Sequence, residues 1–120
     1  NGVAGTVIDG ACRDVHMCLK LGYPVYSRSY SMRTGKDRVQ VDATNVPVSI
    51  GGARVHPNDI MRGDSDGVIV IPKEHEDKVL EAAEAIEAAE DKIRAALKSG
   101  MRLDEARQLN QYHHLQSRED

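Results

Sequence analysis

The sequence predicts an α/β fold in which several short strands precede one long helix. Three observations support this prediction. A β-branched, apolar segment occupies residues 3–8, short apolar segments separated by turn residues fill 50–72, and the apolar spacing changes to about 3.6 residues from Lys73 onward. We therefore assign residues 1–72 to a β-rich part and residues 73–120 to a helical region of the same domain.

The first elements are expected to be a strand, a turn and a short helix. Residues 3–8 are typical of a strand that is buried on both faces, and Gly10 is expected to form the turn after it. Residues 14–21 place their apolar side chains on one face of a helix, and Gly22 is a helix-ending residue. The dipeptide Arg13-Asp14 would then lie between the strand and the helix.

Short strands and turns are expected in the middle of the chain. Residues 24–26 predict a second strand, and the polar segment 28–38 predicts an exposed loop. Residues 39–41 and 46–50 are expected to be strands as well. A hairpin turn is expected at Asp66-Gly67, because Asp-Gly is a common turn dipeptide.

The last third of the chain predicts helices. Apolar residues of 73–100 fall near one stripe of an amphipathic helix, and Gly100 is a suitable C-terminal stop. Many residues of the stripe are alanines, which favours close packing on the sheet or against another subunit. Residues 101–120 predict a weaker helix or a tail.

Composition excludes several functional classes. The 120 residues carry a formal charge of −3 and four tyrosines as their only aromatic residues, which argues against nucleic-acid binding. No apolar run approaches the roughly 18 residues of a membrane span. The two cysteines, Cys12 and Cys18, indicate a reducing, cytoplasmic setting and are expected to be unpaired, buried or half-buried thiols.

Arg13 and Asp14 are the strongest candidates for a functional site. Ligands of open α/β sheets bind at the carboxyl ends of strands, where this pair is expected. Arginine offers a planar fork to a carboxylate, and aspartate offers a hard oxygen ligand to Mg²⁺. The alternative is that Asp14 caps the following helix and that Arg13 is only a surface ion-pair partner.

Several sequence runs together resemble the RraA-like family. They are "GVAGTVIDGACRD", "GYPVYSRS", "NVPVSIGGARVHPNDIMRGDSDGVIVIP" and, in the long helix, "IRAALKSGM". The resemblance covers residues 2 to about 105. It implies a swivelling β/β/α fold, with a mixed sheet followed by a long C-terminal helix, assembled as trimers or dimers of trimers with active sites at subunit interfaces.

The resemblance also implies a set of site residues. Asp14 matches the family's ligand for Mg²⁺ or Mn²⁺, and Arg13 matches its substrate-binding arginine. A neighbouring subunit's helix is expected to supply a glutamate, for which Glu90 is the best match. Family aldolases carry Arg-Asp-x-x-Glu/Asp, whereas Met17 occupies the acidic position here.

The implied activity is that of a divalent-metal-dependent lyase acting on 2-oxo acids. Family members cleave 4-hydroxy-4-methyl-2-oxoglutarate or 4-carboxy-4-hydroxy-2-oxoadipate and decarboxylate oxaloacetate, through a metal-stabilised pyruvate enolate. Because Met17 cannot support a base for aldol cleavage, we expect decarboxylation to survive better than cleavage. The alternative from the same family is a non-catalytic regulator that binds a ribonuclease.

The family's first half is expected as a companion segment. That half normally precedes "GVAGTVIDG" and carries a glycine-containing loop that binds the pyruvyl end of the substrate. We expect it as a separate or cleaved chain, since the first strand would otherwise leave one edge unpaired. A third interpretation follows, in which this chain is a structural subunit and its partner holds the chemistry.

Overall fold

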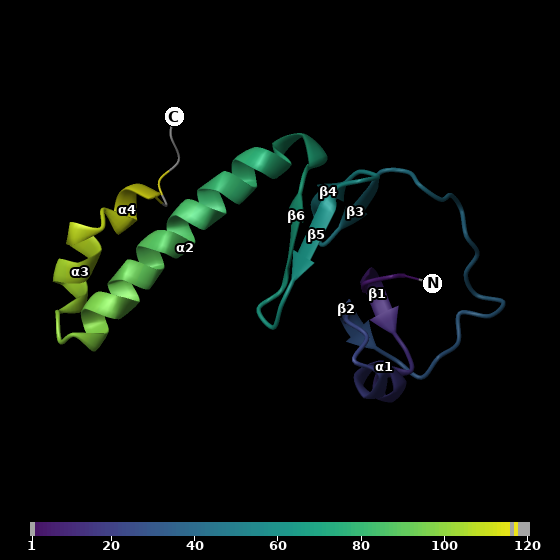
Figure 1. The fold of residues 1–120 in the computed structure, drawn as a ribbon. Helices are drawn as coiled ribbons and strands as arrows, with labels where there is room; N and C mark the ends of the chain where they lie inside the picture. Colours follow the sequence, from purple (N-terminus) through teal and green to yellow (C-terminus); the bar gives the residue numbers. More distant parts are fainter. Residues whose placement is uncertain (1, 116, 118–120) are drawn as a thin grey trace. The chain divides into compact units, whose positions relative to one another are not determined.

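The computed structural model describes residues 2–115 and 117 (Figure 1). The chain divides into two compact units, Asn1–Lys73 and Glu74–Asp120. The first unit holds all the strands of the described residues, and the second holds the long helix. Among the described residues, no helix is long and apolar enough to cross a membrane.

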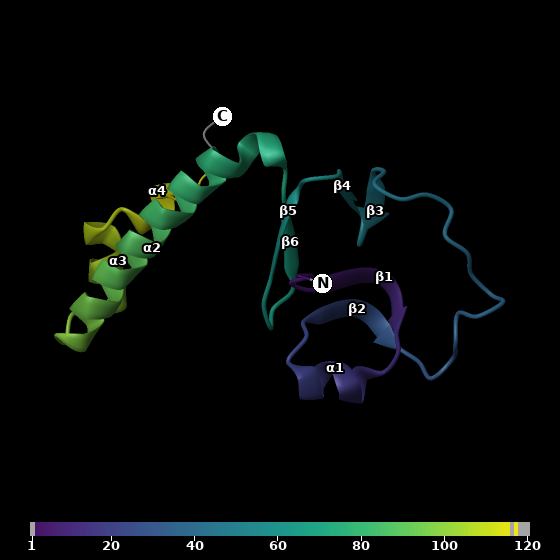
Figure 2. The same ribbon diagram turned by 45° about the vertical axis from the view of Figure 1, so that its right-hand side comes forward.

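A parallel strand pair forms the start of the first unit. Strand β1 (Thr6–Cys12) pairs with β2 (Val25–Tyr30), and helix α1 (Val15–Leu21) connects them (Figure 2). The expectation of a turn at Gly10 is wrong, because β1 continues through this residue. Gly10 instead lies where the register shifts between Ile8 and Ala11, a place where a residue without a side chain is easily accommodated.

Two hairpins complete the first unit. Strands β3 (Val48–Ile50) and β4 (Ala53–Val55) form one antiparallel pair, and β5 (Ile60–Gly63) and β6 (Val68–Ile71) form the other. The described residues thus form three two-stranded sheets rather than one mixed sheet. The turn predicted at Asp66-Gly67 is confirmed as part of the β5–β6 connection.

A long loop separates β2 from β3. Residues 31–47 contain no helix or strand (Figure 1), so the strand expected at 39–41 is wrong. Val39 and Val41 are 77% and 79% exposed. β-Branched residues favour strands only where a partner strand and a packing surface are available, and this segment has neither among the described residues.

The carboxylates of Asp9 and Asp59 connect strands and turns of the first unit through hydrogen bonds. Asp9 of β1 accepts hydrogen bonds from the Arg28 side chain of β2 and, at 3.3 Å, from the Gly51 backbone N–H of the β3–β4 turn. Asp59 accepts bonds from the backbone N–H groups of His56 (2.7 Å) and Lys73 (3.0 Å). These bonds compensate for a small apolar core.

The contact between Gly63 and Tyr26 joins the β5–β6 hairpin to β2. A Cβ atom added to Gly63 would lie 2.6 Å from Cζ of the Tyr26 ring. That separation is far below an ordinary carbon–carbon contact of about 3.5–4.0 Å. The absence of a side chain at Gly63 is therefore what admits the Tyr26 ring.

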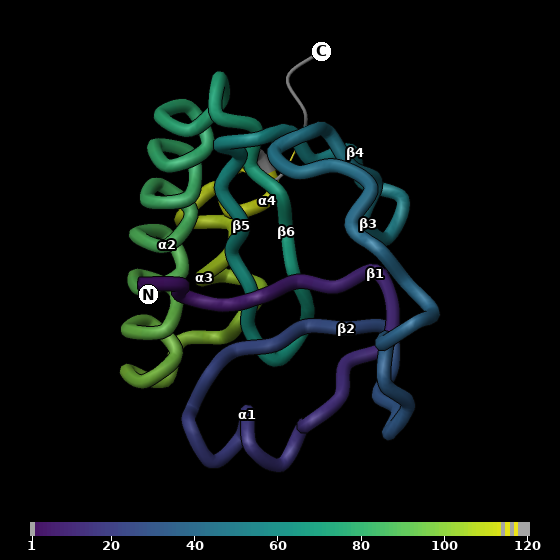
Figure 3. The backbone as a smooth tube through the Cα atoms, turned by 90° about the vertical axis from the view of Figure 1, so that its right-hand side faces the viewer, coloured from purple at the N-terminus to yellow at the C-terminus, as the bar shows by residue number. Residues whose placement is uncertain are grey.

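The second unit is a small helical assembly. Helix α2 (Glu76–Lys98) follows a short 3₁₀ turn (Lys73–His75), and α3 (Leu103–Leu109) and α4 (Tyr112–Leu115) fold back along it (Figure 3). Among the described residues of this unit, Ala89, Ile93 and Ala106 are buried. The helix predicted over 73–100 is confirmed, and the weak final segment forms two short helices. Its last part, residues 116 and 118–120, lies outside the described residues.

We predict that the stability contribution of Asp59 disappears in acid. Hydrogen bonds from the His56 and Lys73 backbone lower the pKa of Asp59 from its ordinary 3.8. The contribution is therefore present above the unfolded-state pKa and is lost as pH falls through the lower folded-state pKa. Asp59→Asn should lower Tm at pH 7, and the difference from wild type should shrink below pH of about 4.

Thermal unfolding followed by circular dichroism at pH 7 and in acid tests this prediction. The matched control is Asp42→Asn, which changes an exposed carboxylate in the long loop. A Tm difference for Asp59→Asn that is equal at both pH values would contradict it.

We also predict that Gly63→Ala destabilises the first unit by about 1–3 kcal/mol, because the new methyl group overlaps the Tyr26 ring. The cost should be largely relieved when Tyr26 is replaced by leucine, which lacks the overlapping ring atoms. A double-mutant cycle from urea denaturation measures this coupling. Additive effects of the two substitutions would show that the contact is unimportant.

Candidate functional site

The Arg13–Asp14 dipeptide lies at the carboxyl end of β1, as expected. Asp14 precedes α1 in a left-handed conformation (φ 61°, ψ 30°), and its carbonyl oxygen accepts bonds from the N–H groups of Met17 and Cys18. Its side chain makes no capping hydrogen bond. The structure therefore does not support a side-chain capping role, although a left-handed residue other than glycine costs on the order of 1 kcal/mol.

The two side chains of this turn face each other and are open to solvent. Nε of Arg13 lies 3.3 Å from Oδ2 of Asp14, and the side chains are 49% and 68% exposed. The Arg13 ion pair of the alternative interpretation thus exists, with Asp14 as the partner. An ion pair with this exposure contributes little to stability, so an incoming ligand can separate the two groups at small cost.

The donor set of this turn fits a strongly hydrated divalent ion. The described residues contain no group of three or more His, Cys, Asp or Glu side chains that could enclose a metal. Mg²⁺ does not require such a group, because it commonly takes one or two carboxylates and keeps several waters. The exposed carboxylate of Asp14 suits an ion whose remaining ligands are waters and substrate oxygens.

Met17 lies one helical turn after Asp14. Its backbone N–H donates to the Asp14 carbonyl at 2.9 Å, and the residue is 51% exposed. A thioether is only a weak acceptor and cannot take up a proton at neutral pH. This turn of α1 therefore offers no general base from Met17.

The two cysteines lie beside the same turn. Both are free, with Cys12 buried and Cys18 half-buried, which confirms the expectation for them. Sγ of Cys12 donates to the Arg13 carbonyl at 3.1 Å. Burial, together with the neighbouring Cys18, raises the pKa of the Cys12 thiol.

Glu90 belongs to α2 in the second unit. Its carboxylate accepts a bond from Nη2 of Arg94 at 2.7 Å and another from the Tyr112 hydroxyl at 3.0 Å. Within its own chain Glu90 therefore connects α2 to α4. Its expected role in a neighbouring subunit's site stays a prediction.

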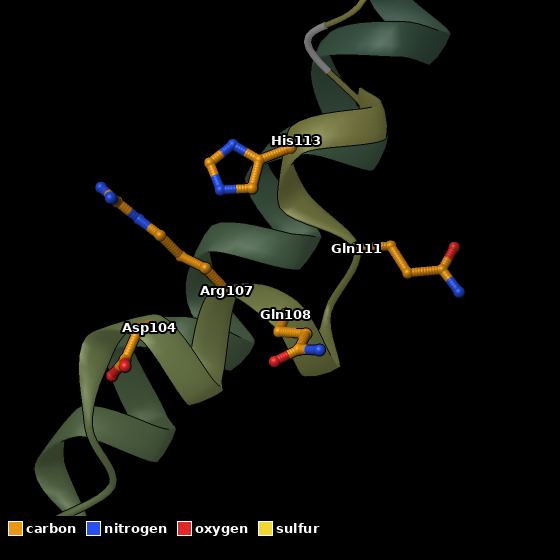
Figure 4. Close-up of a pocket in the computed structure, with 5 residues that line it drawn as sticks. All are labelled: Asp104, Arg107, Gln108, Gln111 and His113. Carbon is orange, nitrogen blue, oxygen red and sulfur yellow. The ribbon is translucent and has the colours of Figure 1, made fainter.

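The second unit also carries an open hollow of about 630 Å³. Figure 4 shows its lining side chains: Asp104, Arg107, Gln108, Gln111 and His113. Arg107 and His113 extend to one side, whereas Gln111 points away from them (Figure 4), and the Arg107 guanidinium lies 5.7 Å from the centre of the Tyr112 ring. The polar groups do not converge, so the hollow has no evident catalytic arrangement.

Comparison with known proteins identifies relatives of this chain. It is 38% identical over 108 residues to "Protein DlpA" of Legionella pneumophila, covering 90% of this chain and 18% of that protein. It is 39% identical over 90 residues to "Putative 4-hydroxy-4-methyl-2-oxoglutarate aldolase" of Halalkalibacterium halodurans, covering 75% of this chain and 42% of that protein. The chain thus spans less than half the length of these two relatives.

A solved structure supports the fold. The crystal structure of an uncharacterized protein from Pseudomonas syringae pv. tomato matches with a TM-score of 0.86 and 39% identity, over 89% of this chain and 54% of that one. The family model described as "RraA-like: Aldolase/RraA" matches residues 1–70, which include the whole Arg13–Asp14 turn. Because this match covers more than half of the chain, the resemblance is confirmed: the chain belongs to the RraA-like family.

Proposed function

We propose that this chain is part of a divalent-metal-dependent lyase that acts on 2-oxo acids. The observation that carries the proposal is the exposed Arg13–Asp14 pair on the left-handed turn after β1, with a carboxylate that caps nothing. Family membership supports the same chemistry, since relatives are named for aldol cleavage of a 2-oxo acid. The reactions proposed are decarboxylation of oxaloacetate and cleavage of 4-hydroxy-4-methyl-2-oxoglutarate or a similar substrate.

Arg13 and Asp14 have separate roles in this proposal. The Arg13 guanidinium binds a substrate carboxylate through its planar fork and stabilises negative charge as the carbon–carbon bond breaks. Asp14 holds the divalent ion, Mg²⁺ or Mn²⁺, beside that carboxylate. The ion, when bound, supplies Lewis-acid polarisation of the 2-oxo group.

Decarboxylation requires fewer catalytic groups than aldol cleavage does. Loss of CO₂ from oxaloacetate needs a stabilised electron pair on the three-carbon product, which then takes one proton to give pyruvate. Aldol cleavage also needs a base to remove the proton of the 4-hydroxyl group. With Met17 in the acidic position of family aldolases, we propose decarboxylation as the stronger activity.

The complete site is proposed to form in an assembly. Trimers or dimers of trimers would bring Glu90 of one copy toward the Arg13–Asp14 turn of another. A companion segment, equivalent to the first half of the family domain, would supply the pyruvyl-binding loop. In that assembly, Arg13 of this chain would bind the substrate carboxylate, and Asp14 would bind the divalent ion.

Met17 also favours a second candidate function. A regulator that binds a ribonuclease through its surface needs no acidic residue at this position. The two functions differ in their dependence on Asp14, because surface binding does not require a metal ligand.

The first prediction of the proposed function concerns Asp14→Ala. In the assembled protein, with companion segment, this substitution should lower Mg²⁺-dependent pyruvate release from oxaloacetate by at least about 100-fold, because the only carboxylate of the turn is removed. A coupled lactate dehydrogenase assay, corrected for the rate with metal alone, measures it. EDTA should have the same effect on wild type.

Asp42→Ala is the matched control and should retain the wild-type rate. A folded Asp14→Ala assembly that still releases pyruvate at the wild-type rate would refute the lyase proposal. If the protein is instead a regulator, Asp14→Ala should not change its affinity for the ribonuclease.

The second prediction concerns Met17→Glu. The new carboxylate would restore an acidic side chain one turn after Asp14, and the ratio of aldol cleavage to decarboxylation should rise at least about 10-fold. Met17→Gln, of similar size but without a carboxylate, is the control and should leave the ratio unchanged. Equal ratios for the two variants would show that the residue at 17 does not set the reaction.

A further inference from the structure

We propose that Tyr112 is a latch that holds the Glu90 carboxylate within its own chain. The Tyr112 hydroxyl of α4 donates a hydrogen bond to Oε1 of Glu90 on α2 at 3.0 Å. In this proposal α4 must move off α2 before Glu90 can act at the Arg13–Asp14 turn of another copy. The latch regulates the site of the proposed function and therefore rests on that proposal.

Both carboxylate oxygens of Glu90 accept hydrogen bonds from the same chain. Oε1 accepts the bond from Tyr112, and Oε2 accepts a bond from Nη2 of Arg94 at 2.7 Å. Arg94 lies one turn farther along the same helix, whereas Tyr112 belongs to a separate helix. The Glu90 side chain is 34% exposed, so most of it is covered. Departure of α4 is the movement that would free a carboxylate oxygen while α2 stays intact.

The Tyr112 side chain is held by both neighbouring helices. The guanidinium of Arg107, on α3, lies 5.7 Å from the centre of the Tyr112 ring, which is within the range of a cation–π interaction. A hollow of about 160 Å³ at this place is lined by Glu90, Ile93, Arg94, Leu103, Arg107 and Tyr112. Tyr112 thus fastens α4 to α2 through its hydroxyl and to α3 through its ring.

The attachment of α4 is suited to local opening. Helix α4 has four residues, which is far too few for a helix that is stable by itself, so it depends on its contacts with α2 and α3. Its last residue, Leu115, is 38% exposed. The preceding Gln111 has φ 50°, a left-handed conformation that is unfavourable for a residue other than glycine. Opening would relieve this conformation and needs no change in α2.

Tyr112→Phe tests the latch, because it removes the hydroxyl and keeps the ring beside Arg107. In the assembled protein, with companion segment, we expect Mg²⁺-dependent pyruvate release from oxaloacetate to rise at least about 5-fold, since more copies have Glu90 available. Tyr23→Phe is the matched control and should keep the wild-type rate. It removes a hydroxyl that hydrogen-bonds with Thr6 at 2.6 Å, at the end of β1 opposite Arg13.

Two results of this assay would overturn the latch. One is an unchanged rate in Tyr112→Phe, and the other is a lower rate, which would show that the hydroxyl positions Glu90 for the reaction. The gain must also act through the carboxylate, so Tyr112→Phe should leave the rate unchanged when it is added to Glu90→Gln. A gain of equal size in the Glu90→Gln background would contradict the proposal as well.

Limited proteolysis follows α4 independently of turnover. Chymotrypsin cleaves after both tyrosine and phenylalanine, so wild type and Tyr112→Phe carry the same cleavage site. After normalisation to the unfolded chains, we expect cleavage after residue 112 to be at least about 5-fold faster in the variant, because opening precedes cleavage. Equal cleavage rates would overturn the proposal. If wild type releases no pyruvate above the rate with metal alone, the proposed function fails, and the cleavage rates alone decide whether the Tyr112 hydroxyl holds α4.

Discussion

The parallel pairing of β1 with β2 is the constraint on which the candidate site depends. Parallel neighbours require a crossover connection, and here the chain reverses direction through α1 and a few turn residues. The reversal begins within two residues of the end of β1, at Arg13 and the left-handed Asp14. Both side chains are consequently displayed at the carboxyl end of the strand, where ligands of α/β proteins bind. At the start of α1 the Asp14 backbone carbonyl accepts the first helical hydrogen bonds, and the Asp14 side chain makes no capping bond. The carboxylate is therefore available to bind a ligand.

The first unit compensates for a sparse core with specific polar contacts. Cys12 and Val55 are its buried apolar residues among those described. Asp9 connects β1 to β2 and to the β3–β4 turn, and Asp59 joins the β4–β5 turn to Lys73, two residues after the end of β6. Large apolar side chains such as Leu19 and Leu21 of α1 are exposed, and the proposed assembly would provide a surface to cover them.

The sequence predicted the elements whose signals are local. The long helix, the hairpin at Asp66-Gly67 and the short helix that ends at Gly22 follow from apolar spacing and turn residues alone. The expected strand at 39–41 is wrong because strand formation depends on a partner that local sequence does not specify. The turn expected at Gly10 is wrong because glycine is equally common at a strand irregularity and in a turn, and the local sequence does not distinguish the two. The position of Arg13 and Asp14 follows from their place after a strand, whereas the left-handed turn at Asp14 depends on how the backbone enters α1.

In the proposed function the Arg13–Asp14 turn holds a hydrated divalent ion. The most direct measurement is paramagnetic line broadening in ¹⁵N-labelled protein, within its assembly, as Mn²⁺ is added in substoichiometric amounts. We expect the amide signals of Arg13, Asp14 and Val15 to broaden first and to recover with EDTA. Broadening that begins instead on the acidic face of α2, at residues such as Glu81 and Glu84, with these three signals unchanged, would contradict it.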